Sequence, residues 1–342
     1  MVTVYHSPGM EHHVGKFLDM TELERYETTR DWNKPAIWMS LYNFKDYLAF
    51  KFHEGPKLVY WFGSDVTALI TTGLMWTSQN WVASSEDLVQ LINSKNCIHV
   101  CQNELLQSEL ASVGIDSVVR PLYLGDLDSF ETCFKPSKNP SVYTVVSAGR
   151  PGFYGVDWIH QIADKTDVDF HIYGCRMDWN TYRKMHKGRG MTLNELRLGY
   201  KYWTTQENVT YHWRKVKEFN WSNPNSRGRY EHLTQIKGLP EQEFNEKIQS
   251  HQAFLRLPEH DGVSQTVMRA LAMGQYVCDR INYPFVTQVT SPDEVLEFVN
   301  GLHLETEPNQ DISLLNEVVN DFDWLDSFLK SNPKEEEDEW LM

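Results

Sequence analysis

The chain has 342 residues, 41% hydrophobic and 13% aromatic, so it is long enough to bury two cores and is not a disordered polymer. Its net charge of −15 excludes general nucleic-acid binding unless the basic residues are gathered in one segment. No run of 18 apolar residues occurs, and the start MVTVYHSPG lacks the basic and apolar parts of a signal peptide. We therefore expect a cytoplasmic protein without a membrane span, in the host cytoplasm if it is viral.

Short apolar strands alternate with helical segments in the first part of the chain. Strands are expected at 1–7, 36–43, 57–66 and 96–103, and helices at 87–95 and 103–114. In the fourth strand, CIHVC places Cys97, His99 and Cys101 two residues apart, which could suggest a metal site. This spacing is not a usual zinc pattern, and the five cysteines are scattered, so a buried strand with reduced thiols is favoured.

A second alternating block follows a boundary segment at 121–141, where Pro, Ser and Lys occur without periodicity. Its expected strands are 143–150, 169–174, 253–258 and 276–280, and its expected helices are 156–166, 241–251 and 264–274. Strands separated by helices form parallel sheets, so the fold class is α/β. The predicted domains are 1–135 and 136–325, followed by a C-terminal helix and acidic tail at 326–342.

The segment 176–240 has the opposite charge from the rest of the chain, with 13 basic and 5 acidic residues. Aromatic residues lie among the cations, among them Trp179, Tyr182, Tyr200, Trp203, Tyr211, Trp213, Trp221 and Tyr230. Phosphate neutralisation combined with base stacking needs such a mixture, which suggests contact with duplex DNA. A solvated loop whose aromatics pack on the domain is the alternative interpretation.

The stretch LPEHDGVSQTVMRALAMG, residues 257–274, predicts a helix that starts near Ser264. The turn at Asp261, Gly262 and Val263 would then lie at the positive end of the helix, where backbone N–H groups favour an anion. Arg269 follows one turn later and could help to hold it. Asp261 could also simply cap the helix, a role compatible with ligand contact.

Five short motifs occur in an order that resembles one enzyme family. They are GSDV after a strand, VVRPLYLGDLDSF, SAGRPGFYGVDWI, HIYG and HDGVSQTVMRALAMGQYV. In this order they resemble the retaining glycosyltransferases of the GT-B fold with a Glu-x7-Glu motif, the family 4-like type. The resemblance covers most of the chain and implies two Rossmann-like domains with parallel sheets. It has no counterpart for segment 176–240, which looks like an insertion.

The resemblance implies specific roles at the donor diphosphate and sugar. Gly149 and Arg150 match the family's Gly-Arg turn, which contacts the diphosphate, whereas a family lysine is replaced by Tyr154. Asp261 matches the first acidic motif residue, which contacts the donor sugar, and Arg269 replaces the second, which usually meets the ribose. We interpret Arg269 as compensation for the cation missing at Tyr154. The predicted catalytic residues are Asp261, Arg150 and Arg269.

The remaining candidate residues fall into a donor set and an acceptor set. The predicted donor set is Gly149, Arg150, Tyr154, Gly174, Glu259, Gly262, Val263, Ser264, Gln265 and Arg269. The predicted acceptor set is His6, Gly63, Asp65, Arg183, Lys184, Lys187, Trp203 and Trp213. Gly63 and Asp65 could instead only shape a turn, and His6 could be a core or loop histidine. The Asp-x-Asp spacings lie in unrelated places, so we expect no metal and no prosthetic group.

The implied reaction is transfer of a sugar from a nucleoside diphosphate donor, most simply a UDP-sugar, with retention of anomeric configuration. In the family the departing phosphate takes the acceptor proton on the same face, so no general base is required. The basic insert favours a hydroxymethylated base in phage DNA as acceptor. A glycan or lipid-linked acceptor, or a non-catalytic binding protein on this fold, are the alternatives.

Overall fold

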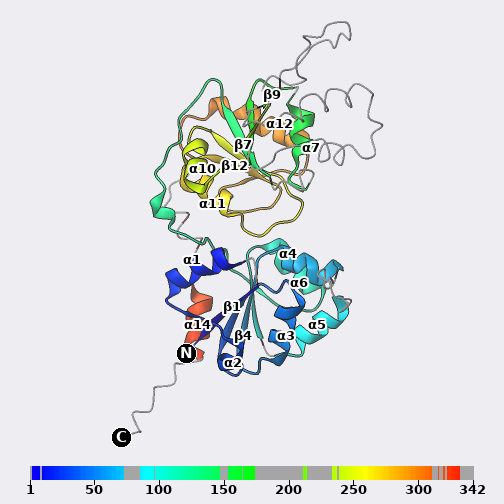
Figure 1. Ribbon diagram of the computed structural model, residues 1–342. Helices are drawn as coiled ribbons and strands as arrows, with labels where there is room; N and C mark the ends of the chain where they lie inside the picture. Colours follow the sequence, from blue (N-terminus) through cyan, green and yellow to red (C-terminus); the bar gives the residue numbers. More distant parts are fainter. Residues whose placement is uncertain are drawn as a thin grey trace. The chain divides into compact units, whose positions relative to one another are not determined.

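The computed structural model describes residues 2–7, 10–72, 85–95, 97–146, 153–163, 165–173, 211–213, 233–236, 239–309 and 322–331, with Leu315 and Val319. They form two compact units (Figure 1). Unit 1 takes the described residues within Met1–Leu127, His260–Gln265 and Asn316–Met342, and unit 2 takes those within Asp128–Glu259 and Thr266–Leu315. Segment 260–265 therefore belongs to unit 1, although both its sequence neighbours belong to unit 2.

Unit 1 contains a six-stranded parallel sheet. Its strands, in spatial order, are β2 (Glu24–Arg25), β1 (Thr3–His6), β3 (Ala36–Met39), β4 (Lys57–Trp61), β5 (Cys97–Cys101) and β6 (Val118–Val119). Its helices are α1 (Glu11–Thr21), α2 (Thr28–Asp31), α3 (Phe44–Phe52), α4 (Ser64–Thr67) with a π-helical turn at Ala68–Thr72, α5 (Ser85–Asn93), α6 (Glu104–Ser112) and α14 (Asp323–Ser331), and a 3₁₀ turn lies at Leu127–Ser129.

Both faces of this sheet are buried, as a parallel sheet requires. Trp38 of β3 packs with Phe50 of α3 on one face. Ile37, the preceding residue, joins Phe17 of α1 and Phe328 of α14 in the core of the other face. Because successive side chains of a strand point to opposite faces, nearly continuous apolar strands were the correct signal for this arrangement.

Unit 2 contains a seven-stranded sheet that is parallel except for one edge strand. Its order is β13 (Thr287–Gln288), β12 (Tyr276–Asp279), β11 (Ala253–Arg256), β7 (Ser141–Val145), β8 (Asp169–Tyr173), β10 (Leu233–Ile236) and the antiparallel β9 (Tyr211–Trp213). Its helices are α7 (Val156–Ile162), α10 (Glu241–Ile248), α11 (Gln265–Ala272) and α12 (Pro292–Gly301), followed by a 3₁₀ turn at Leu302–Leu304. Among the described residues of both units, no helix has the length and apolarity to cross a membrane.

The structure changes two details of the predicted organisation. Strands β9 and β10 lie inside the predicted insertion 176–240, and β10 pairs in parallel with β8. The parallel sheet therefore resumes before the insertion was predicted to end. The C-terminal helix begins at Asp323, and its Trp324 and Phe328 are buried in the core of unit 1. A boundary at residue 325 would divide this helix.

The CIHVC stretch forms strand β5, as predicted. Its His99 is buried and accepts a hydrogen bond from the indole Nε1 of Trp61 (3.3 Å). Burial lowers the pKa of His99 to about 4 because the interior disfavours a charged ring. His99 is therefore a neutral core residue of unit 1.

His251 generates a prediction for the acid stability of unit 2. It is buried, its two ring nitrogens lie 2.9 Å from Ser141 Oγ and 2.9 Å from the Tyr173 hydroxyl, and burial lowers its pKa to about 3. The unfolded chain binds a proton near pH 6.5, so this contribution to stability is complete above pH 6.5 and is lost as the pH falls towards 3. At pH 5 the loss should be about 2 kcal/mol.

Urea unfolding of the parent and His251→Gln at pH 7.5 and 5.0 tests this prediction. The difference in unfolding free energy between the two pH values should be smaller in the variant. His303→Gln, which changes an exposed histidine of the same unit, should behave like the parent. An equal pH effect in His251→Gln and in the parent would contradict the assignment.

Candidate active site

Polar residues gather at the carboxyl edge of the unit 1 sheet, the edge at which its parallel strands end. Ser7 follows β1, Asn43 follows β3, Asp65 follows β4, and Gln102 and Asn103 follow β5. All strands of a parallel sheet end at the same edge, and open α/β sheets bind their ligands there. The candidate residues of unit 1 therefore lie at this edge.

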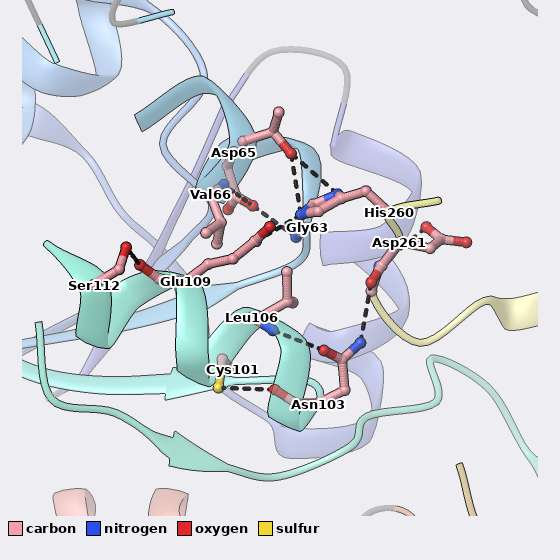
Figure 2. Close-up of polar contacts among 12 residues, drawn as sticks. Gly63, Asp65, Val66, Cys101, Asn103, Leu106, Glu109, Ser112, His260 and Asp261 are labelled. Carbon is pink, nitrogen blue, oxygen red and sulfur yellow. Dashed lines mark hydrogen bonds and ion pairs between the residues drawn. The ribbon is translucent and has the colours of Figure 1, made fainter. Parts of the chain in front are cut away.

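The predicted acceptor residues Gly63 and Asp65 shape the turn after β4. Gly63 has φ +137°, a conformation that side chains strongly disfavour. Oδ1 of Asp65 accepts hydrogen bonds from the backbone N–H groups of Gly63 (2.8 Å) and Val66 (3.0 Å) (Figure 2). It also accepts one from the N–H of Phe62 (3.1 Å). Asp65 is completely buried, and desolvation raises its pKa despite these bonds. The carboxylate is thus occupied in holding the turn, which is the structural alternative that the sequence left open.

Segment 260–265 approaches this turn through two glycines. A Cβ atom on Gly262 would lie 1.8 Å from the carbonyl oxygen of Phe62 and 2.1 Å from Oε1 of Gln102. A Cβ atom on Gly63 would lie 2.7 Å from the backbone nitrogen of Gly262. Only glycine fits at either position, because the neighbouring atoms are mainly backbone and cannot move aside. The two backbones are therefore in direct contact.

Hydrogen bonds from the end of β5 fix the same segment. Asn103 caps α6 by accepting from the N–H of Leu106 (2.9 Å), and its Nδ2 donates to the carbonyl of Asp261 (3.0 Å) (Figure 2). Oε1 of Gln102 accepts from the N–H of Val263 (2.5 Å), and Oδ1 of Asp261 accepts from the N–H of Gly262 (3.0 Å). Two of the backbone donors predicted to hold an anion are thus engaged by protein oxygens in this structure.

Gln265 and Ser264, both predicted donor residues, are also held within unit 1. Oε1 of Gln265 accepts from the N–H of Leu124 (2.9 Å), and its Nε2 donates to the carbonyl of Leu122 (3.2 Å). Ser264 is buried. The Gln265 side chain thus joins segment 260–265 to the backbone of residues 122–124.

His260 makes contacts that the sequence did not indicate. Its Nε2 lies 2.7 Å from Oε2 of Glu109 in α6, and its ring nitrogens lie 3.0 and 3.1 Å from Oγ1 of Thr67 in α4 (Figure 2). Both side chains of the His260–Glu109 pair are largely buried. Residues separated by about 150 positions carry no local signal of such a contact. The pair attaches the segment that carries Asp261 to two helices of unit 1.

His6, the predicted acceptor residue at the end of β1, uses both of its ring nitrogens. Its Nε2 lies 3.0 Å from NH1 of Arg25, which can only donate, and its Nδ1 lies 3.1 Å from the carbonyl of Ser7. Nε2 therefore accepts the hydrogen bond from Arg25. Contact of His6 with the sugar acceptor stays a prediction.

Other candidate residues lie at the carboxyl edge of the unit 2 sheet. Tyr154, in the connection from β7 to α7, lies under the guanidinium of Arg256, 4.9 Å from its ring centre. Gly155 has φ +69°, and a Cβ there would lie 2.4 Å from Cβ of Leu257. Glu259 pairs with Arg280 (3.3 Å). Arg256 and Arg280 are cations of this edge that the sequence analysis missed; their signal was their position at strand ends.

Arg269 lies in the last turn of α11 and contacts α10. Its NH2 pairs with Oε1 of Glu241 (2.5 Å), and its NH1 donates to Oδ1 of Asn245 (3.3 Å). The side chain is only 14% exposed. Compensation for the missing cation by Arg269 stays a prediction, and in this structure part of its charge is balanced by Glu241.

Several predicted site residues lie outside the described part of the chain. These are Gly149, Arg150, Gly174, Arg183, Lys184, Lys187 and Trp203. Trp213 is the last residue of β9, and only its backbone is described. Their assignments remain predictions.

Comparison with solved structures shows which fold carries this site. The lipopolysaccharide outer core galactosyltransferase WaaB matches with a TM-score of 0.58 and 10% identity, over 97% of this chain and 100% of WaaB. A UDP-forming α,α-trehalose-phosphate synthase from Burkholderia xenovorans matches with a TM-score of 0.55 and 9% identity, over 95% of this chain and 82% of the synthase. The chain has the GT-B fold. The predicted fold class is confirmed.

TarM also matches, with a TM-score of 0.51 and 12% identity over 88% of this chain. This chain spans 56% of TarM, about half of its length. No protein-family profile and no curated protein sequence matches the chain. At these identities the similarity establishes architecture, and the activity has to be argued from the site.

The glycine contact generates a prediction about segment 260–265. Gly262→Ala should lower the free energy of unfolding by about 1–3 kcal/mol, because the new methyl group meets the Phe62 carbonyl and the backbones must separate. Amide hydrogen exchange at Gly262 and Val263 should become faster. Gly15→Ala is the control, since a Cβ there meets nothing closer than 3.9 Å. Unchanged stability and exchange in Gly262→Ala would show that the two backbones are not in contact.

Proposed function

We propose that the protein is a retaining glycosyltransferase that uses a nucleoside diphosphate sugar, with UDP as the expected carrier. The observation that carries the proposal is the GT-B fold with charged and polar residues at the carboxyl edges of both parallel sheets, where α/β folds bind nucleotides. The similar structures include a galactosyltransferase and a UDP-forming synthase, which supports the same reaction class. No prosthetic group is part of the proposed reaction.

In the proposed reaction, the bond between the anomeric carbon and the phosphate oxygen breaks while the acceptor oxygen bonds to that carbon on the same face. The acceptor proton passes to the departing phosphate. Negative charge develops on the diphosphate, so nearby cations lower the barrier. Arg150 and Arg269 are the proposed cations, and Asp261 is the proposed contact to the donor sugar. Asp261 suits this role because it is partly exposed and its segment is hydrogen-bonded to the rest of unit 1 at four residues, His260, Asp261, Val263 and Gln265.

We further propose that segment 176–240 recognises the acceptor, and that the acceptor is duplex DNA with a hydroxylated base, such as phage hydroxymethylated DNA. The support is compositional: 13 basic against 5 acidic residues, with aromatics among them, in a chain of net charge −15. A base inside a duplex has to leave the stack to react, and Trp203 or Trp213 could fill the gap. A glycan or lipid-linked acceptor would not need this combination.

Asp261→Asn tests the donor-site assignment. An asparagine Oδ1 can still accept from the N–H of Gly262, so the segment should keep its position while losing the negative charge. We expect at least a tenfold fall in nucleoside diphosphate release from the matching nucleotide sugar, with an unchanged melting temperature. Asp19→Asn, on the exposed side of α1, should have full activity. Full activity in Asp261→Asn would remove Asp261 from the site.

A charge-reversal variant tests the DNA proposal. Changing Arg183, Lys184 and Lys187 to Glu should weaken DNA binding and flatten its dependence on salt by about one unit of log–log slope per lost phosphate contact. Hydrolysis of the donor by water should remain intact. If the variant modifies hydroxymethylated DNA as well as the parent does, or if the parent binds no DNA at low salt, the glycan or lipid-linked acceptor becomes the better proposal.

A further inference from the structure

His260 makes its hydrogen bonds within the described part of the chain through its ring. The ring lies 2.7 Å from Oε2 of Glu109 (Figure 2) and 3.0 Å from Oγ1 of Thr67. Among the described residues, the backbone N–H and carbonyl of His260 have no hydrogen-bond partner. Only 17% of the His260 side chain and 23% of the Glu109 side chain are exposed. The imidazole therefore determines where this residue lies.

Both partners of His260 belong to helices that are fixed in the core of unit 1. Glu109 lies on α6, whose Leu106 and Leu110 are buried in that core. Thr67 is the last residue of α4, which packs against α6. Because packed interiors resist displacement, a ring bound to both helices keeps one position.

Asp261 lies between this attachment and a second one. On its carboxyl side, its carbonyl accepts from Nδ2 of Asn103 (3.0 Å). The N–H of Val263 then donates to Gln102 (2.5 Å). On its amino side, His260 is the one residue that remains before the chain leaves unit 1. Since a residue has only two soft backbone dihedrals, fixing both of its neighbours fixes the direction of the Asp261 side chain.

We propose that His260 and Glu109 are positioning residues for sugar transfer, which act by holding the Asp261 carboxylate against the donor sugar. This inference rests on the proposed function, because it takes Asp261 as the contact to that sugar. Displacing such a contact by about 1 Å can slow a reaction about 100-fold, so an attachment outside the chemistry is enough to control the rate. A pair that only stabilised the fold would change the melting temperature and leave the turnover of the folded enzyme as it is.

Four variants of the full chain separate positioning from stability: His260→Ala, Glu109→Ala, the combination of both, and Glu109→Gln. The three alanine variants should lower kcat for UDP release about 10- to 100-fold, with the KM for the nucleotide sugar changed less than about threefold, because the contacts to the nucleotide are untouched. The double variant should lose no more than either single variant, since both act through one hydrogen bond. Glu109→Gln should recover part of kcat, because its amide oxygen can still accept from the ring.

UDP-glucose, UDP-galactose and UDP-N-acetylglucosamine are the donor probes, and the kinetics use the one that the parent turns over fastest. Glu104→Ala is the control, since it removes an exposed carboxylate from the same helix, and its kcat should equal that of the parent. Amide hydrogen exchange gives a readout that needs no activity. The N–H groups of Gly262 and Val263 should exchange faster in the alanine variants of the pair and as in the parent in the control.

The outcomes separate this inference from the proposed function. Lower kcat together with faster exchange supports the inference. Unchanged kcat in the folded variants overturns it, and so does a lower kcat without faster exchange, because His260 would then act by direct contact. If the parent turns over none of the three donors, the proposed UDP-sugar function is wrong. Faster exchange then still supports the positioning of Asp261 by the pair, and unchanged exchange overturns it. Should the alanine variants not fold, Glu109→Gln decides by the same two readouts.

Discussion

The position of Asp261 depends on the close approach between the backbone of Gly262 and the carbonyl of Phe62. A side chain at residue 262 would overlap that oxygen, so the contact exists only because both facing residues, Gly63 and Gly262, lack a Cβ. At the same approach, Gln102 accepts a hydrogen bond from the N–H of Val263 and Asn103 donates one to the carbonyl of Asp261. The segment that connects β11 to α11 in sequence therefore becomes part of unit 1 in space.

Much of the fold was predictable because the sheets are buried on both faces. Strands such as AIWM and KLVYW are apolar throughout, and helices between them leave only a parallel arrangement. Strand β10 was not predicted. Two of the four residues in its sequence LTQI are polar, and it follows a long basic segment that interrupts the alternation of strand and helix signals. Helix α3 was missed for another reason: Asn43, which forms its capping box with Asp46, was assigned to the end of a strand.

The candidate site was predictable in position more than in detail. Strand ends and the glycine turn marked the carboxyl edges correctly, because topology alone brings them together. The partners of each side chain depend on tertiary contacts that no local pattern contains. The carboxylate of Asp65 accepts hydrogen bonds from three backbone N–H groups, and Arg269 forms an ion pair with Glu241 on a neighbouring helix. Arg256 and Arg280 lie at strand ends 24 positions apart, and their common support by one connection appears only in the folded unit.

The existing hydrogen bonds of segment 260–265 limit the free energy that its backbone N–H groups could contribute to binding a nucleotide sugar. The N–H groups of Gly262 and Val263 already donate to Asp261 and Gln102. A phosphate oxygen bound there would replace the present acceptor of each N–H group. The side-chain oxygen of Gln102, buried at the end of β5, would then lose its hydrogen-bond partner. Such an exchange gains little free energy. The present partner of Arg280 is the exposed carboxylate of Glu259, and this ion pair is weak. A hydrogen bond from such a guanidinium to a more highly charged group would contribute about 1.5–3 kcal/mol. Replacing the present partner therefore costs less free energy at an exposed ion pair than at a buried backbone hydrogen bond.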